Sequence, residues 1–578
     1  MAFPRNCQRQ ALALGICLWA LGVTSRASAQ QADSVAPSDS DAAAAPPDVV
    51  APTPATATIA PPSNAAEGPV EAPDATPEAH TLSGAAPDPS APLATAPEID
   101  ATGNAKVDTT GLEQANDEQQ DRVRYQLERI ELRGNARTRV NVILRYLPFR
   151  PGKQLDVDDP EFTLARYRLL GTGFFRDVQF SLRKGSKRGK VVLIVDLEER
   201  NTVVVNGIWF GLSADSNSQG KQQPLSAYGG VDVAETNVGG SGYSLGGAIG
   251  IARGQYAWRL RFSDPGFLGS PWMITGSLLH NRALDFFGSG TVRFAPTESA
   301  TPQPTSHAVL PYSRFGGSIG IGRDISVSSQ LWFHYRLERI RADVPAFAQE
   351  DGRGKIEPIQ FDILNGSSVF SAVRANFQSD TRDHPFLPTQ GWLISTWGEL
   401  GLAPFGSDYD YQRFDISASS WWKVKGTEHV FRLQGFAGAM SGRNVPFFEQ
   451  YYVGDFSDFL PARMLGLNMD SRTPWNFFGT SIGTVRYGHY AAEVAGEYRV
   501  PVYRGHRSVF GIDFFLRAGL WGIANHRDLI DPAPRYKGLQ NLPIDFTANV
   551  GFRMDTSAGG LVFSFSNVLG FLPVRGGG

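Results

Sequence analysis

The segment DTRDHPFLPTQG, residues 380–391, separates two stretches in which apolar and polar residues alternate, VFSAVRANF before it and GWLISTWGEL after it. A period of two is the period of a β-strand. The prolines and the glycine of the segment prevent further strand pairing, and its close charges neutralise one another across a tight turn. We therefore predict a hairpin turn that fixes the register of two strands, or alternatively docks a neighbouring domain. The residues that define this turn are Asp380, Arg382, Asp383, Pro385, Pro388 and Gly391.

Strand-like stretches of this kind recur from Asn201 to the C-terminus. About fifteen runs of roughly ten residues alternate in this way, for example YSLGGAIGIAR and LWFHYRLERI, and none is a continuous apolar helix. A soluble β-sandwich would have shorter strands and would face its apolar side chains inward. A transmembrane barrel faces them outward to lipid, with aromatic residues near the strand ends. Residues 200–578 are therefore predicted to form an antiparallel transmembrane β-barrel.

The lengths of the connections predict which end of this barrel is which. Connections after even-numbered runs are short, whereas several after odd-numbered runs are long, at 281–313, 341–368, 441–490 and 522–544. Outer-membrane barrels have short periplasmic turns and long external loops. The turn at 380–391 follows an even-numbered run. It is therefore predicted to face the periplasm, on the same side as the segment that precedes the barrel.

Residues 1–29 have the features of a secretory signal peptide. Arg5 and Arg9 form a basic region, ALALGICLWALG is an apolar core, and Ala-Ser-Ala at 27–29 offers a cleavage site. The apolar core is shorter than the ~20 residues that a membrane-spanning helix needs. The two cysteines of the sequence, Cys7 and Cys17, lie within this segment, so the exported chain is expected to have neither a disulfide nor a thiolate metal site.

Residues 30–120 are rich in alanine, proline, threonine and serine and carry an excess of acidic residues. Between 31 and 120 there are fifteen Asp or Glu residues and one lysine, Lys106. Such a segment buries too little apolar surface to offset the loss of chain entropy on folding. We predict a disordered linker that acts as a spacer, with an acidic bait for a basic partner as the alternative.

Residues 121–199 have the pattern of one small α+β domain. YQLERIELRGNA is predicted to be a strand, and TRVNVILRYLPF has apolar residues at helical spacing. A second helix is predicted from Asp159-Pro160, a cap followed by a first-turn proline, to Gly171. RDVQFSLRKG and KVVLIVDLEER complete the order strand, helix, helix, strand, strand. The exposed strand edges of such a domain suit pairing with an extended guest chain.

These parts together resemble the POTRA-plus-barrel superfamily of outer-membrane assembly and translocation factors, of the BamA- and TamA-like, bacterial surface antigen type. DTRDHPFLPTQG is close to that family's DTRDxPxxPxxG turn, and ETNVGGSGYSL, SDPGFLG and AGEYRVPVY support the resemblance over residues 124–570. The resemblance implies a barrel of about sixteen antiparallel strands in the bacterial outer membrane. It also implies one POTRA-like βααββ domain in the periplasm.

The resemblance further implies a function and partners. Proteins of this kind receive unfolded outer-membrane or secreted client proteins at the periplasmic domain. The barrel then inserts or exports the client without nucleotide hydrolysis. The implied partners are outer-membrane lipid, such clients and accessory periplasmic proteins.

Two positions depart from the family pattern. In the family, a long external loop enters the lumen with an Arg-Gly-aromatic motif, and its arginine meets an aspartate on a later strand. Here FLPARMLGLN supplies Arg463 followed by Met464 and Leu465, and the strand reads FLRAG, with Arg517 in place of the aspartate. Asp513 lies four residues earlier, on the same face of the strand, and is expected to neutralise one of the two arginines. The alternative is that other contacts hold the loop to the wall.

The C-terminus, LGFLPVRGGG, is a poor closing strand because Pro573 lies within it. Bacterial barrels of this type have an even number of strands, so either a weak sixteenth strand lies there or one strand precedes it unnoticed. A weak closing strand would leave the seam with the first strand poorly paired. In the family, that seam is where a client strand is proposed to enter.

Enzyme, metal and nucleic-acid motifs are missing from the sequence. G-x-S-x-G occurs at 316–320 and 479–483, but the first lies in a strand run and the second in a loop, whereas a nucleophile elbow needs a strand-to-helix turn. The nine histidines show neither HExxH nor a ligand cluster. We predict no enzymatic activity, no metal or cofactor and no nucleic-acid partner. The alternatives to an insertase or translocator are a passive outer-membrane pore and a dedicated exporter of one partner protein.

Overall fold

The computed structural model describes residues 124–156, 159–213, 224–288, 291–352, 355–456, 463–469, 471, 475–506, 508–530 and 536–566. The predicted signal peptide (1–29), the linker (30–120) and the closing strand expected around Pro573 lie outside the described residues and stay predictions. The described residues all fall within one compact unit that spans residues 47–578. Among them, no helix is both long enough and apolar enough to cross a membrane.

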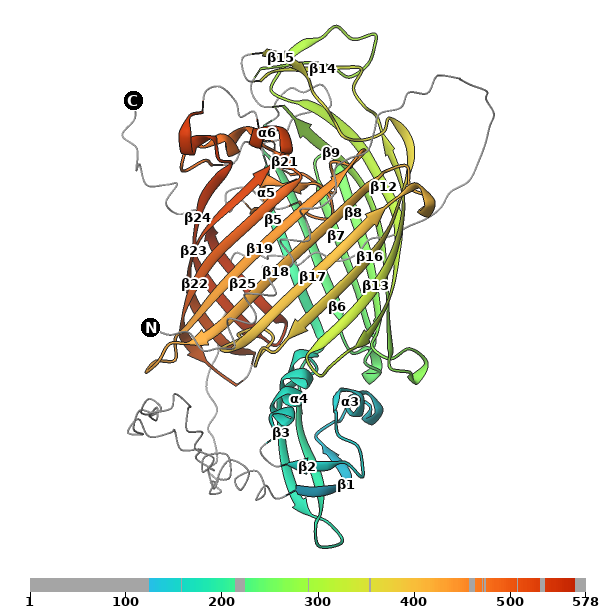
Figure 1. Ribbon diagram of the computed structural model, residues 1–578, viewed down its shortest axis with the longest axis vertical. Coiled ribbons are helices and arrows are strands. Elements are labelled where there is room, and N and C mark those ends of the chain that lie inside the picture. The colour runs from blue at the N-terminus through green and yellow to red at the C-terminus, as the bar shows by residue number, and fades with distance from the viewer. Residues whose placement is uncertain are drawn as a thin grey trace, which may run out of the picture. The chain divides into compact units, whose positions relative to one another are not determined.

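The N-terminal domain is a four-stranded sheet with two helices (Figure 1). The strand order is β2-β1-β4-β3, in which β1 and β4 are parallel and the other pairs antiparallel. The elements are β1 (Arg124–Arg133), α3 (Val140–Tyr146), β2 (Gln154–Asp156), α4 (Pro160–Gly171), β3 (Phe175–Lys184) and β4 (Lys190–Glu199). The predicted order strand, helix, helix, strand, strand is confirmed, and the structure adds the short strand β2.

Local sequence explains where α4 begins and what it packs against. The side chain of Asp159 accepts a hydrogen bond of 2.9 Å from the backbone N–H of Glu161, and Pro160 occupies the first turn. One apolar face of each helix then packs on the sheet. The buried residues of this core include Val142, Ile143, Leu147, Phe149, Ala165, Leu169, Val178, Leu193 and Val195.

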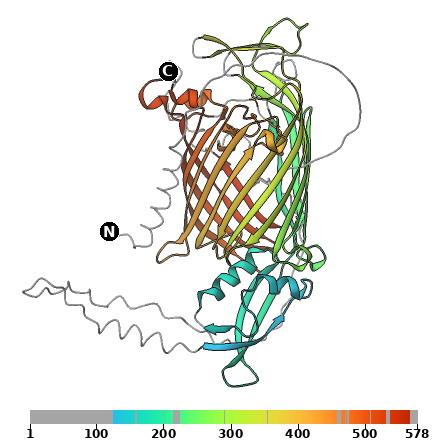
Figure 2. The same ribbon diagram turned by 45° about the vertical axis from the view of Figure 1, so that its right-hand side comes forward.

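The rest of the described chain forms one antiparallel sheet of fifteen strands that curls into a barrel (Figures 1 and 2). Neighbouring strands follow one another along the chain, which confirms the predicted transmembrane β-barrel with an N-terminal α+β domain. The strands are β5 (Val203–Ser213), β6 (Ser226–Glu235), β7 (Ser244–Ala252), β8 (Gln255–Asp264), β9 (Trp272–Phe287), β12 (Ala308–Asp324), β13 (Ser329–Ala342), β16 (Gly366–Asp380), β17 (Gly391–Gly401), β18 (Tyr411–Lys423), β19 (Val430–Gly442), β22 (Tyr490–Arg504), β23 (Val509–Ala524), β24 (Ile544–Thr556) and β25 (Gly559–Ser566).

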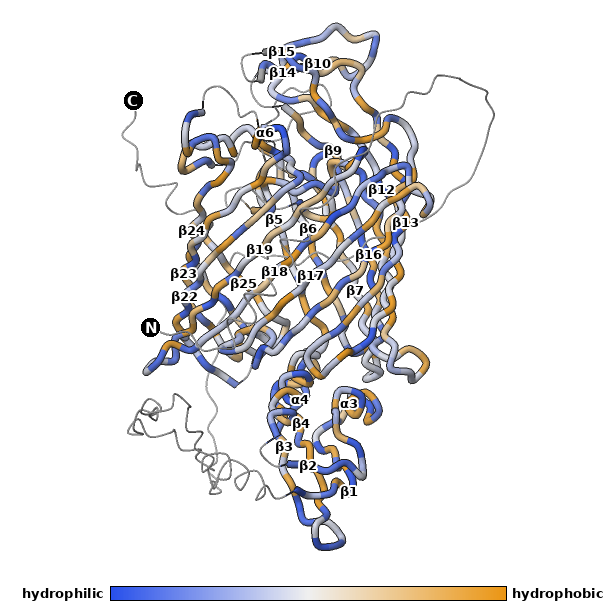
Figure 3. The backbone as a smooth tube through the Cα atoms, viewed as in Figure 1, coloured by the Kyte–Doolittle hydropathy of each residue, from blue (hydrophilic) through white to orange (hydrophobic). Residues whose placement is uncertain are grey.

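The alternation of apolar and polar residues along the strands places apolar side chains on the outer face of the barrel and charged side chains on its inner face. On β23, Leu516 is 52% exposed whereas its neighbour Phe515 is 2% exposed. Figure 3 shows hydrophobic and hydrophilic residues interspersed along the barrel strands in this way. Apolar side chains face lipid, and buried charged residues such as Arg336 and Glu338 face the lumen.

The barrel is nearly closed, and its first and last described strands, β5 and β25, lie at the seam. They stand at the two ends of the sheet order. The backbone N–H of Val205 donates a hydrogen bond of 2.9 Å to the carbonyl of Ala558, which lies in the turn between β24 and β25. The side chain of Asn201 donates to the Ser557 carbonyl in the same turn at 2.9 Å. This seam is thus joined at the end that carries the small domain.

Two long connections carry a second sheet outside the barrel wall. β10 (Val292–Ala295) and β11 (Gln303–Thr305) lie between β9 and β12, and β14 (Phe347–Gly352) and β15 (Lys355–Pro358) lie between β13 and β16. They pair in the order β11-β10-β14-β15. Both connections follow odd-numbered barrel strands, as expected for external loops.

We predict that Leu516→Arg destabilises the barrel by about 2–4 kcal/mol, because a charge then faces lipid near the middle of β23. Equilibrium unfolding in urea, in lipid vesicles, measures the effect. Leu542→Arg is the matched control, since Leu542 is similarly exposed but lies outside the strands, between β23 and β24. Equal stability of the two variants would contradict the assignment of the Leu516 face to lipid.

Candidate functional site: a loop held in the barrel lumen

The connection between β19 and β22, residues 443–489 (the lumen loop), folds back into the barrel. Its described part contains β20 (Tyr451–Tyr452), α5 (Val453–Phe456), η4 (Ser481–Thr484) and β21 (Tyr487–Gly488). Its large apolar and aromatic side chains are buried in one cluster together with inward-facing residues of the barrel wall. The buried loop residues include Phe447, Phe448, Tyr451, Tyr452, Leu467 and Ile482.

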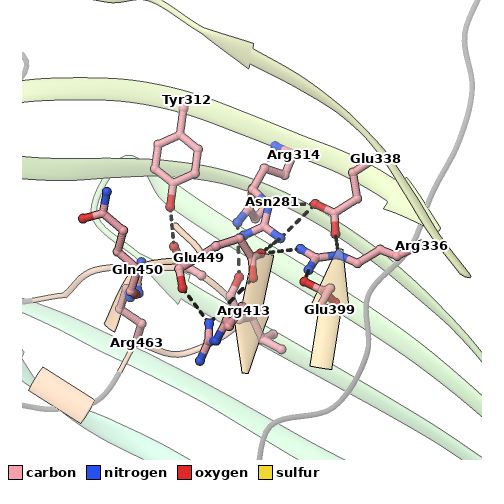
Figure 4. A network of polar contacts seen from close by, with 12 residues as sticks. Asn281, Tyr312, Arg314, Arg336, Glu338, Glu399, Arg413, Glu449, Gln450 and Arg463 are labelled. Atoms are coloured by element: carbon pink, nitrogen blue, oxygen red, sulfur yellow. Dashed lines mark hydrogen bonds and ion pairs between the residues drawn. The ribbon is translucent and has the colours of Figure 1, made fainter. Parts of the chain in front are cut away.

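Glu449 lies at the centre of a charged cluster that joins the lumen loop to the wall (Figure 4). Its Oε1 lies 2.7 Å from Nη2 of Arg336 and 4.0 Å from Nη2 of Arg314. Its backbone carbonyl accepts a hydrogen bond of 2.5 Å from Arg413. Three different strands, β12, β13 and β18, each contribute one of these arginines, so a single loop residue ties three parts of the wall together.

Wall carboxylates balance the wall arginines. Glu338 of β13 accepts a hydrogen bond of 2.9 Å from Nε of Arg314 and also pairs with Arg336. Asp415 of β18 pairs with Arg413 at 2.8 Å. A buried charge is costly unless it is paired and hydrogen-bonded. Loss of any member therefore leaves buried opposite charges with fewer partners.

Glu449 remains ionised although it is buried. Burial raises the pKa of a carboxyl group, but the guanidinium groups of Arg336 and Arg314 hold the pKa of Glu449 at about 2. The next loop residue towards the N-terminus, Phe448, places its ring 4.3 Å from the Arg314 guanidinium carbon. The lumen loop thus presents both a carboxylate and an aromatic face to the wall.

The tip of the lumen loop is a tight turn around Gly466. Met464 and Leu467 form an antiparallel bridge, and Gly466 between them has a φ of +79°. A Cβ at this position would lie 2.5 Å from Nδ2 of Asn281 on the wall. The hydroxyl of Tyr312 donates a hydrogen bond of 2.8 Å to the Gly466 carbonyl. The turn therefore requires glycine at 466 both for its backbone conformation and for its close approach to the wall.

A second wall carboxylate, Asp285 of β9, holds the loop beyond its tip. Its Oδ1 accepts hydrogen bonds from the side-chain amide of Asn468 at 3.0 Å and from the hydroxyl of Tyr487 at 2.5 Å. Gln255 of β8 donates to the backbone carbonyl of Asn468 at 2.8 Å. Two distant segments of the lumen loop thus meet on one wall residue.

Arg463, predicted as the loop arginine, lies within the lumen loop among aromatic rings. It donates a hydrogen bond of 3.2 Å to the carbonyl of Gln450. Its guanidinium carbon lies 5.0 Å from the ring centre of Tyr452 and 5.3 Å from that of Tyr487. These three contacts stay within the loop, and Arg463 also lies close enough to Asp285 and Tyr312 of the wall to interact with them electrostatically.

The two predicted wall residues, Asp513 and Arg517, face the same side of β23, as their spacing suggests. Asp513 pairs with Arg504 at 2.7 Å and lies 3.8 Å from Nε of Arg499. Arg517 pairs with Glu493 on the neighbouring strand β22. Within the described part of the chain, no ion pair joins either residue to Arg463. A role of these three residues in holding the loop stays a prediction.

The predicted turn at 380–391 joins β16 to β17. Nε and Nη2 of Arg382 bind the two carboxylate oxygens of Asp380 at 2.9 and 2.7 Å. Asp383 accepts hydrogen bonds from the backbone N–H groups of Thr389 and Gln390 at 2.7 and 3.2 Å. The two aspartates thus neutralise an arginine and satisfy backbone donors that strand pairing no longer reaches.

The remaining predicted residues shape the backbone of this turn. Gly391 has a φ of +98°, and a Cβ there would press on the Thr381 carbonyl oxygen. Pro385 accepts a hydrogen bond of 3.2 Å from Arg382 through its carbonyl, and the carbonyl of Pro388 accepts one from Arg499. The turn is therefore bonded both within itself and to strand β22.

The small domain makes polar contacts with turns on the periplasmic side of the barrel. Domain residues contact residues at the ends of even-numbered barrel strands or in the connections after them. These contacts include Arg145 with the Gly266 carbonyl, Arg168 with Asp324 at the end of β12, Tyr167 with Gln390, and Arg176 with the His506 carbonyl. The turn at 380–391 is thus one of the places where the domain contacts the barrel, through Gln390, and a docking role of its six predicted residues stays a prediction.

Sequence reasoning did not single out Glu449, Gly466 or the arginines that contact Glu449, which are Arg314, Arg336 and Arg413. A signal existed for the wall: Arg336 and Glu338 alternate with Tyr335 and Leu337, which places charges on the inward face of a strand whose other face is apolar. The lumen loop has no such period. Its contacts depend on which segments the closed barrel brings together.

This geometry defines a class of protein: an outer-membrane β-barrel with a loop anchored in its lumen and an α+β domain on the periplasmic side. Residues 237–569 match the Omp85 superfamily domain, and the chain belongs to the Omp85 superfamily. The expected resemblance is therefore confirmed. Membership places the barrel in the bacterial outer membrane with its POTRA-like domain in the periplasm, and it agrees with the expectation of a non-enzymatic protein.

Two curated relatives are similar to this chain. It is 22% identical over 338 residues to the outer membrane protein assembly factor BamA of Nitratidesulfovibrio vulgaris, which covers 58% of this chain and 37% of that protein. It is 24% identical over 301 residues to a putative outer membrane protein assembly factor of Treponema pallidum, with coverage of 49% and 34%. The chain thus spans little more than a third of the length of these relatives.

Two solved structures align with this chain over much of its length. BamA from Haemophilus ducreyi lacking POTRA domains 1–3 aligns at 17% identity and a TM-score of 0.41, covering 76% of this chain and 80% of that one. CdiB from Escherichia coli aligns at 11% identity and a TM-score of 0.46, covering 76% and 73%. At these scores the two likenesses do not distinguish one branch of the superfamily from another.

We predict that Glu449→Gln weakens the anchoring of the lumen loop by about 3–5 kcal/mol, because it leaves Arg336 and Arg314 buried with too few carboxylates. Hydrogen exchange of the loop amide groups in the folded barrel measures the change. Glu428→Gln is the control, because Glu428 forms an exposed pair with Lys423 that is worth about 0–1 kcal/mol. Unchanged exchange in Glu449→Gln would show that the loop does not depend on the cluster.

We also predict that the lumen loop is released from the wall only at strongly acidic pH. The pKa of Glu449 in the folded protein is about 2, below its ordinary value of 4.5, so the released loop binds the proton more readily. The stabilisation is complete above about pH 4.5 and is lost as the pH falls towards about 2. Exchange rates of the loop, corrected for the intrinsic effect of pH, should rise over this window in the native chain. Glu449→Gln should lack this acid-dependent component, and its presence there would assign it to another group.

Proposed function

We propose that this protein assembles or translocates other proteins in the outer membrane. In this proposal, an unfolded outer-membrane or secreted client binds at the POTRA-like domain. The barrel then inserts or exports the client without nucleotide hydrolysis. Outer-membrane lipid and accessory periplasmic proteins are the further proposed partners.

The observation that carries the proposal is the combination of a docked periplasmic domain with a lumen loop held by Glu449. The domain has a strand edge at β3, which pairs only with β4 in the described sheet and suits the addition of a guest strand. Membership of the Omp85 superfamily also supports this proposed function, as do the assembly-factor names of both curated relatives.

The two alternatives differ in what they would need from this structure. A passive pore needs neither a periplasmic domain nor a loop whose aromatic side chains are buried inside the barrel. A dedicated exporter of one partner protein would use the same domain and barrel, and it differs from an insertase in whether the client ends in the membrane or beyond it.

We predict that the full-length protein in liposomes accelerates the folding of added unfolded barrel proteins several-fold, to an extent that depends on residues 121–199. Folding is followed by the gel shift of the client, and ion conductance is recorded on the same liposomes. The variant without residues 121–199 is first checked for a folded barrel by its own gel shift. Steady conductance with no effect on client folding, with or without the domain, would leave a pore or a dedicated exporter.

A further inference from the structure

The turn at 380–391 (the cross-turn) extends across the periplasmic opening of the barrel. β17 and β16, which it joins, stand seventh and eighth in the fifteen-strand order counted from β25, in the middle of the sheet. In a closed barrel, the middle of the sheet lies opposite its two ends. Any contact between the cross-turn and β24 or β25 therefore spans the opening.

Such contacts are present. Nε2 of His384 lies 3.5 Å from Oδ2 of Asp555, near the end of β24. A Cβ at Gly560 of β25 would lie 2.5 Å from Cδ1 of Phe386, so the Phe386 ring packs directly on the β25 backbone. Leu387 is buried and packs in the same way on Gly511 of β23. The tip of the cross-turn thus rests on the strands that lead to the seam.

Arg200 joins the small domain to the same place. It is the first residue after β4, and its Nη2 donates to Oδ1 of Asp555 at 3.1 Å and to the Thr556 carbonyl at 2.6 Å. Its guanidinium carbon lies 4.7 Å from the ring centre of Phe386. Arg200 and Asp555 are both buried. Asp555 therefore holds the cross-turn through one carboxylate oxygen and the domain linker through the other.

The seam depends on the same turn of β24 and β25. Thr556, Ser557 and Ala558 form it, and Ala558 accepts the hydrogen bond from Val205 of β5 that joins the two ends of the sheet. A shift of this turn therefore changes both the contacts that Asp555 and Gly560 make with the cross-turn and the hydrogen bond between Val205 and Ala558 at the seam. The domain also reaches the cross-turn itself, because Gln390 donates to the Tyr167 hydroxyl at 2.8 Å.

We propose that the cross-turn is a strut that holds β24 and β25 in position at the seam, with Phe386 and His384 as its positioning residues. The small domain contacts this strut at both ends: Tyr167 contacts the base of the strut, and Arg200 contacts its tip. Movement of the domain that withdraws Phe386 from Gly560 frees β25 to separate from β5. This inference rests on the proposed function in one respect, namely that release of β25 is a step in handling a client.

A reversible disulfide tests the strut. Cys7 and Cys17, the two cysteines of the sequence, fall in the predicted signal peptide, so introduced cysteines would be the only ones in the mature chain. In Phe386→Cys/Gly560→Cys, a Cβ at 560 lies 3.3 Å from the Cγ position of residue 386, the side-chain position that a cysteine sulfur takes up, so the two side chains are close enough for a disulfide to be attempted. The matched control is Gln378→Cys/Ser395→Cys, which links two residues already opposite each other on β16 and β17. The mature protein with its small domain is used throughout, and oxidation is verified by gel mobility.

Two readouts are compared in the oxidised and reduced forms. The reduced Phe386→Cys/Gly560→Cys protein lacks the ring, so amide exchange of β25 should be faster than in the native chain. Oxidation should slow it by about tenfold, because the bond replaces the strut. The same oxidation should abolish client folding in liposomes. Oxidation of the control pair should change neither quantity.

Each outcome decides a separate point. Failure of the 386–560 disulfide to form, or equal β25 exchange in its oxidised and reduced forms, overturns the strut. Slowed exchange together with unchanged client folding keeps the strut and overturns its role in release. If no form accelerates client folding, including the native chain, the proposed function fails, while the exchange data still decide the strut.

Discussion

The protein depends on one constraint: inside a membrane, every backbone N–H and C=O group must find its partner within the chain. The fifteen described barrel strands meet it by pairing each strand with its sequence neighbour. The two ends of the sheet are the exception. Among the described residues, the backbone hydrogen bond between Val205 and Ala558 joins the two ends at one end of the seam. In the described part of the chain, strand pairing is thus continuous along the wall, and the seam is joined at the end that carries the small domain.

The same constraint determines where the charges lie. Because lipid-facing positions must be apolar, the charged residues of the strands face the lumen, where they need partners. Arg314, Arg336 and Arg413 find part of their neutralisation in Glu449, which comes from the lumen loop and not from a strand. The family pattern leads one to expect an arginine on the loop and an acid on the wall. Here the loop also contributes an acid, Glu449, to the arginines of the wall, while Asp285 of the wall accepts hydrogen bonds from the loop.

Buried contacts connect the small domain and the cross-turn to the barrel strands at the seam. The cross-turn rises from the middle of the sheet and ends on Asp555 and Gly560, and Arg200 brings the domain linker to the same point. Burial lowers the pKa of His384 below its usual range, which favours the neutral ring against Asp555. Packing therefore dominates this contact, and the Phe386 ring against a glycine is its centre.

The sequence by itself determined the architecture. A period of two along β23, the cap at Asp159 and the turn at 380–391 are local signals, because each arises from residues close together in the chain. They were sufficient for the barrel, for the start of α4 and for the periplasmic side of the turn. Only the tertiary structure decided the contacts of the lumen loop and of the cross-turn. Glu449 and Arg336 are far apart in sequence, as are Phe386 and Gly560, and their meeting requires a closed barrel, which no local pattern encodes.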